Sequence, residues 1–299
     1  MSEIAFSVRK HIVRLTQAEA EIRFLVSCAA PAVDFQVRGR LMGPRCPYAA
    51  TVEVAYPLRE LEREKDKAGA SSILLRTVIP EPSMWDPESP FLYSGPLGIW
   101  QGDKLLEQQT VQVGFIGWGL GTRGLRVNGK YLDLQASVVA RLDVETAVRL
   151  REQHVNCVVV DVREATPATW DTADRYGFFV LGRISDLASW DRARALEGRP
   201  SSLGWILGRQ ALEGLKPKSF DGTSYTGSAP LIGLEVEKLP EQQVSGVSFL
   251  VAAPGVLEQP NSIGLPWLRV ERAGASGFDL SDGILGTLRN WPLPGDMKL

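Results

Sequence analysis

Short segments in which apolar and polar residues alternate follow one another through the first 120 residues of the chain. Six of them are rich in β-branched and aromatic side chains and are separated by Gly, Pro and Asp; they are residues 21–30, 34–43, 48–58, 71–80, 90–100 and 105–117. Alternation with a period of two is typical of a strand that buries one face. Six or seven short strands at this spacing predict an antiparallel β-sandwich of the immunoglobulin type over residues 1–120.

Two runs in this part of the chain do not alternate. The run LRELEREKDKAG, residues 58–69, is dominated by charges, so we expect a solvated loop or a short helix there. The run GWGLGTRG, residues 117–124, is rich in glycine. It lacks the Lys-Ser/Thr ending and the strand-to-helix setting of a phosphate-binding loop, so we expect a linker between two domains.

From Asn128 onward, apolar runs of strand length alternate with segments of helical period. The second helical segment has Thr166 as a candidate N-cap, Pro167 in its first turn and Gly177 just past its end. The helical segments are residues 144–155, 166–176 and 189–198, and the apolar runs are residues 131–139, 156–162, 178–184, 202–208, 230–236, 247–254, 266–271 and 283–291.

This alternation demands parallel strands joined by crossover helices. Eight strands predict a (β/α)8 barrel of the TIM type over residues 121–299. About 170 residues is short for this fold, which usually takes about 250. The segments after Val236 and after Pro254 have room for only a turn or two of helix. We therefore expect a reduced barrel in which several crossovers of the second half are loops.

Composition narrows the classes of partner. The 299 residues are 44% hydrophobic and 23% charged, with a formal net charge of -2, as in an ordinary globular protein. Nothing here favours a nucleic acid or a membrane as partner. Cys28, Cys46 and Cys157 have no metal-ligand spacing, so we expect reduced, buried thiols. The first residues lack the apolar core of a signal peptide, which favours a cytoplasmic protein, although a leader removed before position 1 would also fit.

Several short motifs, in chain order, resemble those of one enzyme family. MWDPESPFLY (84–93) is similar to LWSPENPYLY, QVGFI (112–116) to the last sandwich strand, and NGKYLDLQ (128–135) to NGKPVxLRG. Four more motifs of this chain follow. REQHVNCVVV is similar to the family's KELNFNAVRT, and DRYGFFVLGR is similar to DEYGLLVIDE. RPSSLGWILGRQ is similar to HPSIIxWSLGNE, and LPWLRVERAG is similar to KPIIVSEYG. The resemblance is to glycoside hydrolase family 2, the β-galactosidase, β-glucuronidase and β-mannosidase group. It covers about residues 80–299 and implies a sandwich followed by a barrel.

The resemblance also implies where the chemistry would lie. Retaining glycosidases use two carboxyl groups, a general acid/base and a nucleophile. The acid/base Glu of the family's NE pair falls on Gln210, and its Asn neighbour falls on Arg209. An amide has no proton to give at neutral pH, so the proton-transfer step is lost. The nucleophile position falls on Glu271, which is either a remaining ligand-binding carboxylate or a strand-end residue ion-paired with Arg269 and Arg272.

Other polar positions of the family are replaced as well. The Arg and His of its AVRTSHYP segment fall on Val159 and Val162, the Glu of VIDE falls on Arg183, and GVNRHE reads ASVVAR at residues 136–141. The matches that remain are those that packing requires: Trp85, Pro87, Tyr93, Asp174, Tyr176, Gly177, Trp205 and Leu207. This pattern favours a scaffold that has lost its catalytic groups. We expect its candidate ligand-binding residues to meet at one end of the barrel: Arg183, Arg209, Gln210 and Glu271.

Three interpretations of function stay open. The first is a non-catalytic protein that binds a saccharide or a protein partner and needs no cofactor. The second is a working retaining β-glycosidase with Glu271 as nucleophile and Asp161, Glu164 or Asp186 as an unusual acid/base. The third is an unrelated activity in a reused pocket, which no Ser-His-Asp order, metal-ligand cluster or phosphate loop supports. Substrates with a good leaving group need no proton donor, so their turnover would separate the first two.

Overall fold

The computed structural model describes residues 6–28, 35–65, 71–121, 124–186, 188–194, 196, 198–208, 230–236, 247–252, 267–270 and 284–289. These residues form two compact units, with the boundary between Ile116 and Gly117. Each unit buries a hydrophobic cluster of its own. Within the ranges given, no helix is both long enough and apolar enough to cross a membrane.

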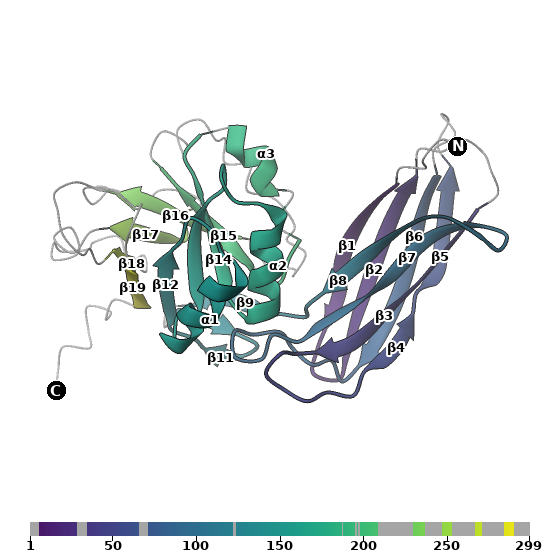
Figure 1. Cartoon of the computed structure of the whole chain (residues 1–299), viewed down its shortest axis with the longest axis horizontal. Helices are drawn as coiled ribbons and strands as arrows, with labels where there is room; N and C mark the ends of the chain where they lie inside the picture. Colours follow the sequence, from purple (N-terminus) through teal and green to yellow (C-terminus); the bar gives the residue numbers. More distant parts are fainter. Residues whose placement is uncertain are drawn as a thin grey trace. The chain divides into compact units, whose positions relative to one another are not determined.

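Two four-stranded antiparallel sheets make up the first unit (Figure 1). One sheet has the order β1 (Phe6–Leu15), β2 (Glu19–Cys28), β6 (Ser71–Pro80) and β5 (Arg59–Lys65); the other has β4 (Val54–Pro57), β3 (Gln36–Arg45), β7 (Leu92–Gln101) and β8 (Lys104–Val113). The apolar faces of both sheets contribute to one core. The alternating pattern therefore predicted two packed antiparallel sheets correctly.

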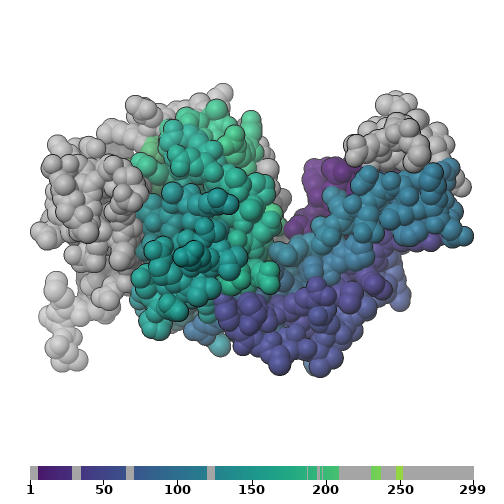
Figure 2. Space-filling model, in the orientation of Figure 1, coloured from purple at the N-terminus to yellow at the C-terminus, as the bar shows by residue number. Residues whose placement is uncertain are grey.

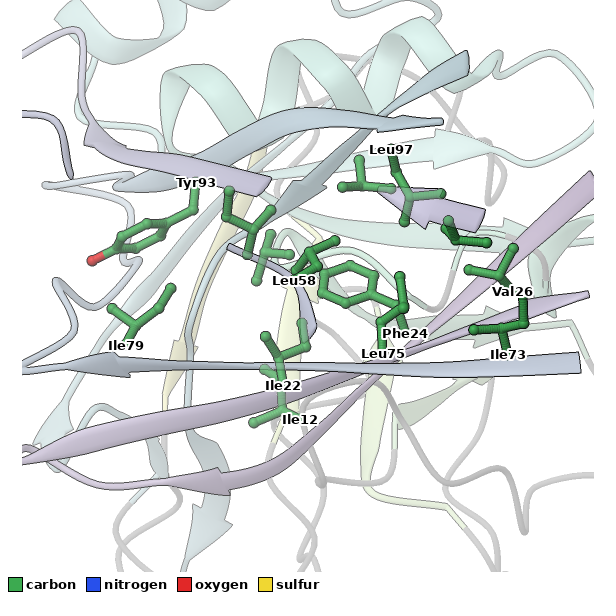
Figure 3. Packing of buried hydrophobic residues seen from close by; sticks show 14 of the residues in the cluster. Ile12, Ile22, Phe24, Val26, Leu58, Ile73, Leu75, Ile79, Tyr93 and Leu97 are labelled. Atoms are coloured by element: carbon green, nitrogen blue, oxygen red, sulfur yellow. The ribbon is translucent and has the colours of Figure 1, made fainter. Parts of the chain in front are cut away.

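Strand β2 illustrates how the alternation builds this core. Ile22, Phe24 and Val26 are fully buried, whereas Arg23 and Leu25 between them are partly exposed. Figure 3 shows Phe24 among apolar side chains of the other strands, including Leu75 and Leu97. Burial of one side chain of this size contributes about 1.5–3 kcal/mol to the free energy of unfolding.

The charged run at residues 58–69 is a strand where the structure describes it, so the prediction of a loop or a short helix was wrong. Residues Arg59–Lys65 form β5, which pairs with β6 at one edge of its sheet. Charged side chains are well tolerated on an edge strand, where they also prevent pairing with other chains. Arg63 of β5 donates hydrogen bonds to Glu60 and to the backbone oxygen of Phe35.

A small antiparallel sheet lies where we expected a linker, so that prediction was also wrong. Its strand order is β11 (Lys130–Tyr131), β10 (Gly124–Val127) and β9 (Trp118–Gly121). Asn128 and Gly129 turn the chain between β10 and β11 with φ values of 50° and 85°. Positive φ at both positions is what a two-residue type I′ hairpin requires. The Asn128 side chain also accepts a hydrogen bond from the Gly117 N–H at 3.0 Å.

Eight strands close into a barrel in chain order (Figure 1). They are β12 (Leu134–Val138), β13 (Cys157–Asp161), β14 (Phe179–Ile184), β15 (Ser202–Leu207), β16 (Leu231–Val236), β17 (Phe249–Ala252), β18 (Trp267–Val270) and β19 (Ile284–Arg289). Strands β12 to β18 pair in parallel, but β19 is antiparallel to both β18 and β12. The expectation of eight parallel strands was wrong for β19, because an apolar strand pattern does not encode strand direction.

Helices α1 (Val144–Glu152), α2 (Pro167–Tyr176) and α3 (Ala188–Arg194) connect the first four strands of the barrel. Helix α2 has the predicted ends: Thr166 is the N-cap residue, and Gly177 ends the helix with a left-handed φ of 76°. The crossovers after β16 and β17 include residues 237–246 and 253–266, which lie outside the described ranges. The expected loss of helices in this half stays a prediction.

The barrel strands have a face toward the helices and a face toward the interior. Val158 and Val160 of β13 and Trp205 of β15 belong to one buried cluster with Trp170 and Ala173 of α2. In Figure 2 the teal-to-green atoms of the helical segments form a continuous surface on this side of the unit. Residues that alternate with the helix-facing ones along each strand therefore face the barrel interior.

Candidate functional site

Among the residues that the structure describes, three charged ones lie on the interior face of the barrel where its parallel strands end. Asp161 is the last residue of β13, Arg183 is the penultimate residue of β14, and Glu235 is the penultimate residue of β16. Asp161 and Arg183 are direct neighbours in the strand register. The carboxyl ends of the strands are where barrels of this kind carry their binding and catalytic groups. These residues therefore define the candidate site.

Arg183 and Glu235 form a two-point ion pair. The Nε atom of Arg183 donates to Oε1 of Glu235 at 2.7 Å, and Nη2 donates to Oε2 at 3.2 Å. Strand β15 lies between the two strands that carry them. The side chain of Glu235 is only 11% exposed and that of Arg183 is 29% exposed. A guanidinium matched to both oxygens of a carboxylate makes strong charge-assisted hydrogen bonds, so each group is committed to the other.

Asp161 is held by Arg163 in the turn that follows β13. The Arg163 backbone N–H donates to Oδ1 of Asp161 at 2.8 Å, and its Nη2 donates to Oδ2 at 2.7 Å. The side-chain hydrogen bonds from Arg163 lower the pKa of Asp161 below its ordinary value, although partial burial acts in the opposite direction. Asp161 is therefore a carboxylate at neutral pH and has no proton to give as a general acid.

The other two carboxylates considered as unusual acids serve local structure. Asp186 accepts hydrogen bonds from the N–H and the hydroxyl of Ser189, both at 2.9 Å, at the start of α3. These bonds lower the pKa of Asp186. Glu164 is exposed in the turn after β13, where its backbone N–H donates to the Asp161 carbonyl. The geometry marks neither of them as a proton donor inside the barrel.

Of the four predicted site residues, Arg183 alone lies among the described ones, at the end of the barrel where we expected it. Arg209 and Gln210 follow β15 and Glu271 follows β18, all outside the described ranges. Their predicted meeting with Arg183 stays a prediction.

Sequence reasoning did not single out Glu235, the partner of Arg183. The available signal was that Glu235 is the one charged residue in the apolar run LIGLEV. It lies two residues after Gly233, so Glu235 and Gly233 are on the same face of the strand.

Val159 and Val162, which fall on polar positions of the family, lie on different sides of the barrel wall. Val159 of β13 is 1% exposed and alternates with the helix-facing Val158 and Val160. Val162 is fully buried within the helix-facing cluster itself. Only Val159 therefore faces the barrel interior, and it presents no hydrogen-bonding group there.

A buried carboxylate beneath the site anchors the segment that leads into β15. Asp174 of α2 is 1% exposed. It accepts a hydrogen bond from the Ser201 N–H at 3.1 Å and another from Nη1 of Arg199 at 3.2 Å. Arg199 is also paired with Asp171. Asp174 thus fixes the RPSS segment in place, which gives a packing reason for a residue that matched the family motif.

The described part of the chain holds no group of His, Cys, Asp and Glu side chains that could bind a metal ion. Cys28, Cys46 and Cys157 are free thiols. Burial raises the pKa of the Cys157 thiol well above its ordinary value, which makes it an unreactive thiol.

Comparisons with known proteins all find similarity to glycoside hydrolase family 2 and its members. The family model Glycosyl hydrolases family 2 matches residues 45–115. A β-galactosidase of Klebsiella pneumoniae is 24% identical over 164 residues, which cover 44% of this chain and 16% of that protein. The chain thus spans a small part of the length of this relative.

Solved structures agree with the sequence matches. A glycosyl hydrolase family 2 member from Bacteroides cellulosilyticus superposes with a TM-score of 0.60 at 12% identity, covering 84% of this chain and 38% of that one. A β-glucuronidase from glycoside hydrolase family 2 superposes with a TM-score of 0.59 at 16% identity, covering 88% of this chain and 30% of that one. At these identities the likeness concerns the fold.

Proposed function

We propose that this chain, a glycoside hydrolase family 2-like protein, is a non-catalytic relative of the family's enzymes. In this proposal the barrel end binds a saccharide or a protein partner and does not cleave glycosidic bonds. The names of the relatives, β-galactosidase and β-glucuronidase, make β-linked sugars the first ligand class to test.

The two units fit the domain types of such proteins. If β1 to β8 are lettered A, B, C, C′, D, E, F and G, the two sheets read A-B-E-D and C′-C-F-G, as in immunoglobulin-type sandwiches. The Tyr93 hydroxyl, at the start of β7, accepts a hydrogen bond from the Ser83 N–H at 2.9 Å, which fits the tyrosine corner of that fold. The second unit fits a TIM-type barrel that is reduced and closed by a reversed last strand.

The ion pair between Arg183 and Glu235 carries the proposal. A retaining glycosidase needs two carboxyl groups free to face the scissile bond from either side. By the resemblance, Arg183 stands at a further carboxylate position of the family, the Glu of VIDE, and not at either catalytic position. The nearby carboxylate, Glu235, is paired with it and so is not free to take over the role of a catalytic carboxyl group. Gln210 at the acid/base position adds the loss of the proton donor.

The proposal is tested with the purified chain and two activated substrates, 4-nitrophenyl β-galactoside and 4-nitrophenyl β-glucuronide. Nitrophenolate departs without protonation, so these substrates report any competent nucleophile. We expect no release above background and no difference between the wild type and the Glu271→Ala variant. Steady release that Glu271→Ala abolishes would contradict the proposal and support a working β-glycosidase with an unusual acid/base. Calorimetric titration with methyl β-galactoside and methyl β-glucuronide then measures sugar binding separately from turnover.

A further inference from the structure

The sheet β1-β2-β6-β5 carries a row of basic side chains, one from each strand. His11 is paired in register with Arg23, Arg23 with Arg76, and Arg76 with Arg59. Residues directly opposite each other on neighbouring antiparallel strands project from the same face. Their neighbours along the strands, such as Phe24, fill the core, so this row lies on the outward face. It spans about 14 Å, three strand spacings of about 4.8 Å.

A buried carboxylate holds the middle of this row together. Glu21 is 5% exposed and accepts hydrogen bonds from Nε of Arg23 at 3.1 Å and from Nη2 of Arg76 at 2.9 Å. The side chains of Arg23 and Arg76 are still 40% and 42% exposed, so each guanidinium keeps donors available to a ligand. One carboxylate between two guanidiniums leaves the middle of the row with a net positive charge.

The two ends of the row are open. His11 and Arg59 are exposed, and neither makes an ion pair or a side-chain hydrogen bond with any residue that the structure describes. The Nε atom of Arg76 is buried and has no hydrogen-bond partner within the same ranges. Basic side chains set directly opposite each other repel, which costs stability in a sheet. A bound anion would relieve that repulsion and accept hydrogen bonds from the exposed donors of the row.

Two further rows lie beside the basic row on the same face. Two positions along the strands, Leu25 is paired with Leu74, and both are partly exposed. Two positions beyond them, Ser27 is paired with Ser7 on one side and with Ser72 on the other. Successive rows are about 7 Å apart. On the edge strands, Arg9 of β1 is paired with Leu25, and the exposed Glu62 and Glu64 of β5 are paired with Leu74 and Ser72. Beside the basic row, the face therefore presents an apolar pair and then hydroxyl groups on β1, β2 and β6, with carboxylates along its β5 edge.

We propose that this face binds an anionic polysaccharide, a polymer of uronic acids or sulfated sugars, laid across the four strands. One pyranose unit is roughly as long as one strand spacing, so acidic groups repeated along the polymer meet successive basic residues. The C–H faces of the sugars lie on the leucines, and their hydroxyls reach the serines. Single-stranded nucleic acid fits less well, because it is bound mainly by stacking on aromatic side chains and these three rows contain no Phe, Tyr or Trp.

The experiment uses the whole chain and two anionic probes, heparin and polygalacturonate, with neutral dextran as the comparison. Arg59→Gln removes an exposed cation at one end of the row, and Arg40→Gln removes the same charge from β3 of the other sheet as a matched control. We expect both anionic polymers to bind in calorimetry at low salt and dextran not to bind. Arg59→Gln should weaken binding about tenfold, the effect of losing one charge-assisted hydrogen bond, while Arg40→Gln should leave it unchanged.

Several results would overturn the proposal. One is absence of binding to both anionic polymers, and another is an equal loss in the Arg59 and Arg40 variants, which would indicate a general charge effect. Binding of single-stranded DNA or poly-glutamate as tightly as the polysaccharides would overturn the assignment to sugars. A Glu21→Gln/Arg76→Gln variant removes one charge of each sign from the middle of the row, and unchanged binding there would also contradict the proposal. Melting temperatures confirm that each variant is folded, and the outcome is independent of the nitrophenyl assay.

Discussion

Arg183 and Glu235 belong to barrel strands that are not neighbours, and their side chains meet across the strand between them. The contact joins positions 52 residues apart in the chain. It lies at the strand ends, where barrels of parallel strands carry their ligand-binding groups. One geometric fact thus has two consequences: the pair ties β14 to β16, and it withdraws a cation and a carboxylate from ligand binding.

Loss of one partner of this pair should destabilise the second unit. Glu235→Gln leaves the Arg183 guanidinium, 29% exposed, without its counter-charge. We expect the free energy of unfolding to fall by about 1–3 kcal/mol, measured by urea denaturation.

Arg163→Gln is the matched control, because the Asp161–Arg163 pair lies at the same end of the barrel but the Arg163 side chain is 53% exposed. Its loss should cost about 0–1 kcal/mol. The double variant Arg183→Gln/Glu235→Gln should recover part of the stability lost in Glu235→Gln. Equal losses of unfolding free energy in Glu235→Gln and Arg163→Gln would show that the Arg183–Glu235 pair stabilises the unit no more than an exposed pair does.

Asp174 should prove structural through its contacts with the segment before β15. Asp174→Asn removes the charge that Arg199 faces and weakens the bond from the Ser201 N–H, so we expect a loss of about 2–3 kcal/mol in the free energy of unfolding. Asp171→Asn is the control, since Asp171 pairs with the same arginine but its side chain is 61% exposed. Similar small losses in both variants would contradict the anchoring role.

Glu21 should make the stability of the sandwich depend on pH in the acid range. The hydrogen bond from Arg76, followed by that from Arg23, lowers the pKa of Glu21 from its ordinary value of 4.5. A depressed pKa means that the stabilisation is complete above the unfolded-state pKa and is lost as the pH falls through the folded-state pKa.

We therefore expect the difference in unfolding free energy between the wild type and Glu21→Gln to be about 1–2 kcal/mol at pH 7 and to shrink below about pH 4.5. Urea titrations at several pH values measure this difference. Glu19→Gln is the matched control at pH 7, because the pair of Glu19 with Arg14 is exposed and its loss should cost about 0–1 kcal/mol. A difference that stays constant down to pH 3 would argue against the pairing.

Local signals in the sequence were reliable where the structure is decided locally. Pro167 and Gly177 mark the ends of α2 because each has a backbone conformation that suits only that position. Alternation revealed the sandwich strands because each has one face in the core. The charged segment Arg59–Lys65 misled us because its strand conformation comes from pairing with β6 and not from its own composition.

The barrel and its candidate site also depend on which strands pair, and not only on local sequence. The reversal of β19 depends on which neighbours close the barrel, and nothing in its residues indicates direction. The partner of Arg183 could not be identified either, because Glu235 approaches it only after three strands have been placed side by side. Resemblance identified the position of Arg183, and tertiary structure decided what it contacts.

Gly182 should tolerate no side chain, because Trp205 of the neighbouring strand lies over it. A Cβ atom at this position would be 2.5 Å from the indole ring of Trp205 and 2.8 Å from Val162. Both neighbours are fully packed in the helix-facing core, so we expect Gly182→Ala to lower the melting temperature, at a cost of about 1–3 kcal/mol. Gly208→Ala is the control, since no atom of the described residues lies within 4 Å of a Cβ there. An unchanged melting temperature for Gly182→Ala would show that Trp205 can move.

Gln210→Glu alone should not create a glycosidase. A general acid contributes about 10²–10⁴-fold to rate when the rest of the site is in place, but this barrel has Val159 where the family resemblance expects an arginine, and Arg183 is tied to Glu235. The barrel would therefore lack the side chains that orient a substrate for attack. We expect wild type, Gln210→Glu and the control Gln210→Ala to release no product from methyl β-galactoside, which needs a proton donor, or from its nitrophenyl counterpart, which does not. Turnover of the methyl glycoside by Gln210→Glu, abolished by adding Glu271→Ala, would mean that one amide is all that separates this chain from an enzyme.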